Sequence, residues 1–401
     1  MTAGTLEVAG QPEVVRKSEP ATRHIPELQS IRGLAALVVV FAHPLSFYAP
    51  PQWYLPVWFI VNSQAAVTIF FVLSGFVLTR SLISRPIDGR TIASYYVKRI
   101  FRIYPALWLM SIAALLYVSL LHYRFPDPYA ATWFLERFQA DRFSPLHIGA
   151  SFFGMLAYLS PPVWTIFIEM LASLFLPLAA WLLVRRPWGF MALFGVLAAL
   201  GIMCSSAHLY YHLDVYLVDF MLGAALTRLP VRPILELGRM VPLKLLAGFA
   251  AVLMMLTRCF LTVDPYDFWL AQWEAAMAAL IIFVFARAGV VSPILRNPAL
   301  VRLGDISYSL YIMHFTIMCL IAKAILLFAP DLPLALGGGF LSLVLAALTV
   351  PTALVVAAWA YARIELPGIA VGQRVVAWMA NWNLYALKGA SKADSQNTLI
   401  S

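Results

Sequence analysis

Two ionisable residues, Arg32 and His43, lie in one apolar stretch, IRGLAALVVVFAH, that otherwise has the pattern of a membrane-spanning helix. An arginine at the centre of such a helix costs about 2.5–3.5 kcal/mol on insertion scales, so these residues usually face a bundle interior and serve chemistry or transport. With ten residues between them, an α-helix separates the two by roughly 16 Å. The spacing predicts one group near a membrane face and the other about halfway across.

His43 is the better candidate for catalysis. Imidazole exchanges a proton near neutral pH, so a histidine inside the membrane suits a general base that acts on a hydroxyl. The alternative is a histidine that hydrogen-bonds between helices or lies near the outer interface, where Pro44 loosens the backbone. Arg32 is expected to contact an anion at the inner rim; the alternative is that it snorkels to the headgroups.

A basic loop precedes the third expected span. Several guanidinium groups on one loop suit a phosphorylated ligand, because they pair with phosphate in a bidentate way. Arg99 and Arg102 are the preferred ligands, since they lie one helical turn apart at the mouth of a span. The alternative is a topogenic loop that contacts anionic lipid. The basic residues are Arg80, Arg85, Arg90, Lys98, Arg99 and Arg102.

Acidic residues also occur inside apolar spans. Glu169, in PPVWTIFIEML, needs a cationic or imidazole partner there and is expected to orient His43; the alternative is a structural salt bridge. Asp214 and Asp219 are weaker candidates for a functional role. We interpret His314 as packed among aromatic residues, and Glu365 as paired with a basic residue at the cytoplasmic rim.

Composition indicates an all-α polytopic membrane protein. The 401 residues are 62% hydrophobic and 12% charged, about half the charged fraction of soluble domains. The alternating pattern of a membrane β-barrel does not occur. No zinc, redox or phosphate-loop motif occurs either, so neither a metal nor a redox role is expected for the three cysteines. About ten spans are expected, at 32–49, 57–80, 104–122, 163–184, 189–208, 211–228, 243–262, 270–287, 305–328 and 334–363.

Charge sets the expected orientation. With ten spans, all but five of the 28 Lys and Arg residues fall on one face, which the positive-inside rule makes cytoplasmic. Both termini are then cytoplasmic, and the net charge of +9 reflects topology rather than nucleic-acid binding. The short apolar segment 147–160 is expected to be re-entrant or peripheral, because a further span would invert the topology.

Six segments together resemble the membrane-bound acyltransferase-3 family. The first resembles the family's first helix, with Arg32 and His43 ten residues apart, and the third matches its basic motif. The last three resemble its Trp-Ser/Thr…Glu, Tyr-Ser-x-Tyr-x-x-His and Glu-x-Pro motifs. Met170 stands where many relatives have a second glutamate, which puts a two-carboxylate role there in doubt. The segments are IPELQSIRGLAALVVVFAH (25–43), FFVLSGFVL (70–78), KRIFRIYP (98–105), VWTIFIE (163–169), LGDISYSLYIMH (303–314) and YARIELP (361–367).

The resemblance implies an enzyme of the bacterial inner membrane that moves an acyl group, most often acetyl, from acetyl-CoA to a hydroxyl of a carbohydrate or glycan-lipid. His43 is then the general base, with Glu169 and Arg32 beside it. Arg99, Arg102, Arg32 and Lys98 are expected to bind the CoA phosphates, with no metal. Transfer through an acyl-histidine is the alternative mechanism. Exopolysaccharide and O-antigen are among the acceptors that the resemblance suggests.

The expected organisation is a disordered cytoplasmic tail (1–25), an acyltransferase transmembrane domain (26–368) and a partly amphipathic cytoplasmic tail (369–401). Some relatives carry a further extracytoplasmic domain, so this chain is expected either to act alone or to work with a separate extracytoplasmic transferase or esterase. Two other classes compete: a transporter or flippase of a lipid-linked sugar, and a scaffold of a polysaccharide-export complex. The absence of visible repeat halves speaks against the transporter.

Overall fold

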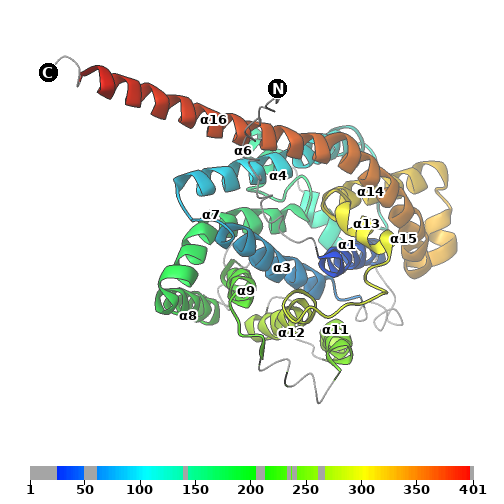
Figure 1. The fold of residues 1–401 in the computed structure, drawn as a ribbon. Coiled ribbons are helices and arrows are strands. Elements are labelled where there is room, and N and C mark those ends of the chain that lie inside the picture. Colours follow the sequence, from blue (N-terminus) through cyan, green and yellow to red (C-terminus); the bar gives the residue numbers. More distant parts are fainter. Residues whose placement is uncertain are drawn as a thin grey trace, which may run out of the picture.

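The fold is known from a computed structural model that describes residues 25–48, 61–138, 143–204, 213–232, 236, 242–260 and 267–397. Within these ranges it is a bundle of helices with one isolated β-bridge, between Tyr48 and Ala130 (Figure 1). The helices are α1 (Pro26–Phe47), α3 (Ser63–Ile83), α4 (Gly89–Tyr117), α5 (Thr132–Leu135), α6 (Pro145–Phe152), α7 (Val163–Arg185), α8 (Pro187–Cys204), α9 (Leu213–Leu226), α11 (Leu243–Phe260), α12 (Phe268–Ala286), α13 (Pro298–Asp305), α14 (Ser307–Phe328), α15 (Leu332–Ala360) and α16 (Leu366–Asn397), with short η segments at Val118–His122, Glu136–Phe138 (η3) and Tyr361–Glu365 (η7).

The predicted all-α membrane architecture is confirmed. Eight of the described helices are long and apolar enough to cross a membrane. Two more helices, α9 and α11, occupy the remaining expected spans, 211–228 and 243–262. The apolar part of α9, Val215–Leu226, is shorter than a full span. The expected N-terminal tail, apart from Ile25, lies outside the described residues.

The third span differs from expectation because its helix is longer. α4 begins at Gly89 rather than near residue 104, and Asp88 caps it by accepting a 2.8 Å hydrogen bond from the Thr91 backbone N–H. This bond and one from the Thr91 side chain hold the pKa of Asp88 below its usual value. Apolar windows miss such a segment because its residues are basic and aromatic. The extension makes the basic residues helical, which fixes the direction of each guanidinium.

The segment 147–160 does not cross the bundle. Its helix, α6, has eight residues, a rise of about 12 Å. The helix ends at Phe152. Two residues later Gly154 has a φ of +72°, a conformation that glycine adopts at little cost. Beside it, the Tyr104 hydroxyl donates to the Phe153 carbonyl across 3.4 Å. The segment therefore packs against α4, in keeping with the predicted non-spanning role.

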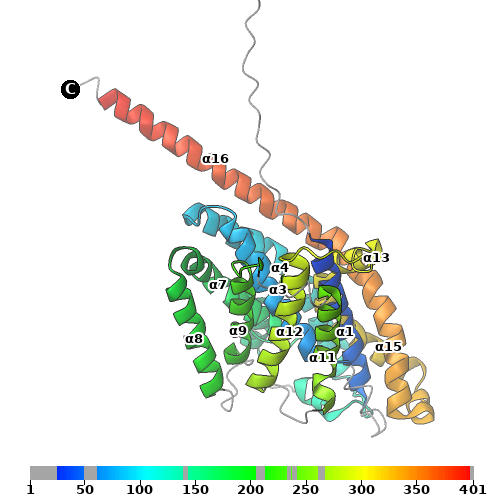
Figure 2. The same ribbon diagram turned by 60° about the horizontal axis from the view of Figure 1, so that its bottom comes forward.

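α16 is one long helix that extends away from the bundle (Figures 1 and 2). Figure 2 shows the beginning of α1, α13 and α16 at the same end of the bundle. Gly368 lies directly against Phe101 and Pro105 of α4, and Gly372 lies against Phe101. A Cβ on either glycine would come within 3 Å of these neighbours. The helix expected in the C-terminal tail is thus attached to the basic part of α4. The cytoplasmic orientation of this end stays a prediction.

α3 and α9 approach each other so closely that their crossing needs glycine. A Cβ on Gly75 would overlap the backbone of Phe220, and one on Gly223 would overlap the backbone of Val72. Small residues let helix backbones come this near in a membrane. The crossing positions α3, which supplies one wall of the site.

We expect Gly223→Ala to destabilise the protein by about 1–3 kcal/mol, because the added methyl group must push α9 away from α3. Thermal unfolding in detergent measures the change. Gly248→Ala is the matched control: this glycine lies on α11 with nothing within 4 Å of its Cβ position. Alanine there should be neutral or slightly stabilising, and equal melting temperatures for both variants would contradict the prediction.

Candidate active site

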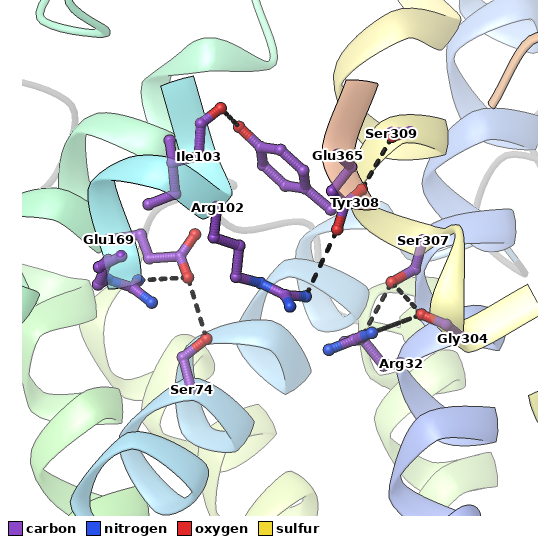
Figure 3. A network of polar contacts seen from close by, with 11 residues as sticks. Arg32, Ser74, Arg102, Ile103, Glu169, Gly304, Ser307, Tyr308, Ser309 and Glu365 are labelled. Atoms are coloured by element: carbon purple, nitrogen blue, oxygen red, sulfur yellow. Dashed lines mark hydrogen bonds and ion pairs between the residues drawn. The ribbon is translucent and has the colours of Figure 1, made fainter. Parts of the chain in front are cut away.

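A cavity of about 460 Å³ opens among α1, α3, α4, α7 and α14. Its charged lining consists of four arginines and one glutamate, and the remainder is mostly apolar. Figure 3 shows Arg32, Arg102 and Glu169 converging from three of these helices. A cavity lining with this excess of guanidinium groups suits an anionic ligand that also has an apolar part. The charged residues are Arg32, Arg80, Arg99, Arg102 and Glu169.

Arg32 points into the bundle and binds the junction between α13 and α14. Its Nη2 donates to the Gly304 carbonyl across 2.6 Å, and its Nε donates to the Ser307 hydroxyl across 2.9 Å (Figure 3). Gly304 lies against the backbone of Gln29 on α1, so this junction comes unusually near the helix that carries Arg32. These bonds are inconsistent with an arginine that snorkels to the headgroups.

Arg99 is the partner of Glu169. The Arg99 Nη2 lies 2.5 Å from the Glu169 Oε1, and the Ser74 hydroxyl donates to the same oxygen across 3.3 Å. The two side chains of the ion pair are only 10% and 23% exposed. The need of Glu169 for a cationic partner was predicted, but the contact with His43 was wrong. A carboxylate on α7 that is bonded to α4 and α3 does not orient an imidazole on α1.

Arg102 has a looser partner. Its Nη2 lies 3.7 Å from the Glu365 Oε1, and the Ser309 hydroxyl donates to the other oxygen of that carboxylate across 2.9 Å. Glu365 is completely buried, whereas the Arg102 side chain remains 39% exposed. Glu365 lies on η7, a π-helical turn, and such turns often occur at functional sites. Its expected pairing with a basic residue is confirmed, and much of Arg102 stays accessible from the cavity.

Lys98, the remaining expected phosphate ligand, is exposed on α4 and is not part of the cavity lining. Asp219 is completely buried and accepts a 3.3 Å hydrogen bond from Gln272, also away from the lining. The side chain of Asp214 lies outside the described residues. Among the described residues, no three His, Cys, Asp or Glu side chains gather as metal ligands.

His43 lies beside a second histidine. The His43 Nδ1 is 3.3 Å from the His314 Nε2, and the ring centroids are 4.9 Å apart. His314 is completely buried and packs with Tyr311 and Phe315. The aromatic surroundings of His314 were predicted, but its contact with His43 was missed. The rule that drew attention to His43, an ionisable group within an apolar span, applies equally to His314.

One layer of aromatic rings separates the cavity from the histidines. Phe70 and Tyr311 line the cavity and pack edge to face, with centroids 5.6 Å apart. The Tyr311 ring is in turn 5.9 Å from that of His314. His43 itself is not part of the lining. The structure therefore brings Arg32, Arg99, Arg102 and Glu169 together and places His43 behind this layer.

Several known proteins are similar in sequence to this chain. A family model described as an acyltransferase domain matches residues 25–359. The chain is 23% identical over 349 residues to the peptidoglycan O-acetyltransferase OatA of Listeria monocytogenes, which covers 79% of this chain and 53% of that protein. It is 28% identical over 337 residues to the acyltransferase MdmB of Streptomyces mycarofaciens, a match that covers 75% of this chain and 80% of that protein. A putative O-acetyltransferase of Staphylococcus aureus is 24% identical over 333 residues, a match that covers 74% of this chain and 51% of that protein. The chain thus spans about half the length of two of these relatives, and no solved structure matches it.

Proposed function

Because the chain belongs to the acyltransferase family, we propose that it is a membrane O-acyltransferase. The group that it moves is an acyl group, in the first place acetyl. The donor is cytoplasmic acyl-CoA, and the acceptor is a hydroxyl of a carbohydrate or glycan precursor. Two relatives are named as O-acetyltransferases, and one of them acts on peptidoglycan. The observation that carries the proposal is the arginine-lined cavity.

The donor's phosphates would bind at the arginine end of this cavity. Coenzyme A carries several phosphate groups, and charge-assisted bonds from guanidinium groups are about twice as strong as neutral ones. The Arg102 side chain is 39% exposed, against 10% for that of Arg99. Arg32 is held in place by α13 and α14, and Arg99 is neutralised by Glu169. We therefore assign the main phosphate contacts to Arg102 and Arg32, and a supporting role to Arg99.

The acyl end would lie at the inner, apolar end of the cavity. There the Thr165 hydroxyl is 3.0 Å from that of Tyr311, next to Phe70. These rings separate the cavity from the histidines, so the proposal requires the acyl end of the donor to displace them. The thioester would then reach the acceptor hydroxyl beside His43.

His43 would act as the general base. Its Nε2 takes the proton of the acceptor hydroxyl while that oxygen bonds to the thioester carbonyl carbon. The carbon–sulfur bond then breaks, and the thiolate of CoA takes the proton back from His43 and leaves as a thiol. The acceptor becomes an ester, and the histidine returns to its neutral form. Base catalysis of this kind contributes about 10²–10⁴-fold to the rate.

The test uses purified protein in lipid nanodiscs with acetyl-CoA that carries radiolabel in the acetyl group. Peptidoglycan fragments, exopolysaccharide and O-antigen serve as acceptors. We expect label to enter at least one acceptor as a base-labile ester while CoA thiol appears. Failure to consume acetyl-CoA with any acceptor would contradict the proposal, and movement of a sugar across the bilayer without covalent change would support a flippase instead.

A further inference from the structure

Two main-chain carbonyls determine which nitrogens of the histidine pair carry protons. The His43 Nδ1 lies 2.9 Å from the carbonyl oxygen of Val39, and the His314 Nδ1 lies 2.6 Å from that of Tyr311. A carbonyl oxygen only accepts hydrogen bonds. An unprotonated nitrogen at either position would place two lone pairs against each other, which is unfavourable, most of all at the fully buried His314. Both histidines therefore carry hydrogen on Nδ1.

The contact between the rings follows from this assignment. A neutral His314 with hydrogen on Nδ1 has a lone pair on Nε2, the atom 3.3 Å from the His43 Nδ1. The Nδ1–H of His43 can then be shared between the Val39 carbonyl and this lone pair. The reverse arrangement, with His314 donating, would leave the Nδ1 of His43 as an acceptor that faces a carbonyl.

From this geometry we infer that His314 is a positioning residue: it holds His43 as the Nδ1–H tautomer and leaves the Nε2 of His43 bare as the base. The inference rests on the proposed function. When Nε2 takes the hydroxyl proton, the imidazolium keeps its Nδ1–H bonded to a neutral acceptor. The arrangement resembles an oriented histidine base in which an imidazole takes the place of the usual carboxylate.

The surroundings explain why a neutral partner suits this place. From α14, His314 and Phe315 pack against the ring of His43. Glu169 and Glu365 are paired with arginines at the cavity. His314 is completely buried, so it accepts a hydrogen bond without adding a charge that would need its own counterion.

Two measurements test the inference. In full-length protein with ¹⁵N-labelled histidine, nitrogen NMR should show the neutral His43 protonated at Nδ1 and bare at Nε2. His43→Gln identifies the signal. In kinetics, we expect His314→Leu to lower kcat about 10- to 100-fold, the size of effect seen when the hydrogen-bond partner of a metal-ligating histidine is removed. The KM for acetyl-CoA should change less than about twofold, because the donor cavity is untouched.

The matched controls separate positioning from packing. His314→Gln restores an oxygen that can accept from the His43 Nδ1–H, so it should recover part of the lost kcat. Met318→Leu, one turn along α14 and also completely buried, should keep normal kcat because the swap conserves volume.

An Nε2–H tautomer of His43 in the unaltered protein would overturn the inference, and so would a His314→Leu enzyme as active as Met318→Leu. A fully active His43→Gln enzyme would instead overturn the proposed base, while the NMR result would still decide the tautomer.

Discussion

Replacing His43 with glutamine is expected to lower the rate of acyl transfer by about 10²–10⁴-fold, the usual contribution of a general base. Glutamine keeps the approximate size and polarity of the side chain but does not take up a proton near neutral pH. Its donor binding should stay normal, because His43 is not part of the cavity lining. Single-turnover transfer from radiolabelled acetyl-CoA to an acceptor in nanodiscs measures the effect on the chemical step.

A suitable control is His122→Gln. This residue ends the short segment Val118–His122 that follows α4, and its ring packs against Phe138. This variant should transfer at nearly the normal rate. Transfer by His43→Gln at a comparable rate would remove His43 from the mechanism. Acid-quenched samples distinguish the two covalent schemes: a base acting on the hydroxyl leaves the protein unlabelled, whereas an acyl-histidine intermediate leaves transient label on it.

The second large effect is expected at Arg102. Arg102→Gln should raise the KM for acetyl-CoA about 10- to 100-fold, because a hydrogen bond to a charged group is worth about 1.5–3 kcal/mol. The value of kcat should change much less, since the guanidinium binds a part of the donor that does not react. Initial rates over a range of acetyl-CoA concentrations separate the two constants.

Two neighbours on α4 serve as comparisons. Lys98→Gln removes a charge that is exposed away from the cavity, so it should leave KM nearly unchanged. Arg99→Gln should lower the melting temperature as well, because it leaves the carboxylate of Glu169 without its cation. A KM for Arg102→Gln that matches that of Lys98→Gln would mean that both residues set topology only.

The fold class was predictable because the cost of placing polar backbone in lipid leaves few alternatives. Runs of apolar residues therefore gave the positions of the spans. The start of α4 at Gly89 was not predictable from hydropathy, because that segment carries Arg99 and Arg102 among aromatic residues. Its helical state depends on the Asp88 cap and on packing against α16, which hydropathy does not report.

The site was predictable in its residue types but not in its pairings. Glu169 needs a partner wherever it lies, yet the choice between His43 and Arg99 depends on how α7 crosses α1 and α4. The contact of His43 with His314 joins residues 271 positions apart, and only the crossing of α1 with α14 creates it. Spacing along one helix gives the separation of Arg32 and His43 but says nothing about the helix facing them.

The two contacts between α1 and α14 have an energetic consequence. Arg32 bonds to Ser307 at one end of this helix pair, and His43 meets His314 further along it. If a phosphate that draws Arg32 away from Ser307 also shifts one helix against the other, the histidine contact changes with it. Thermodynamic linkage then requires reciprocity: whatever factor the donor imposes on the affinity for the acceptor, the acceptor imposes on the affinity for the donor.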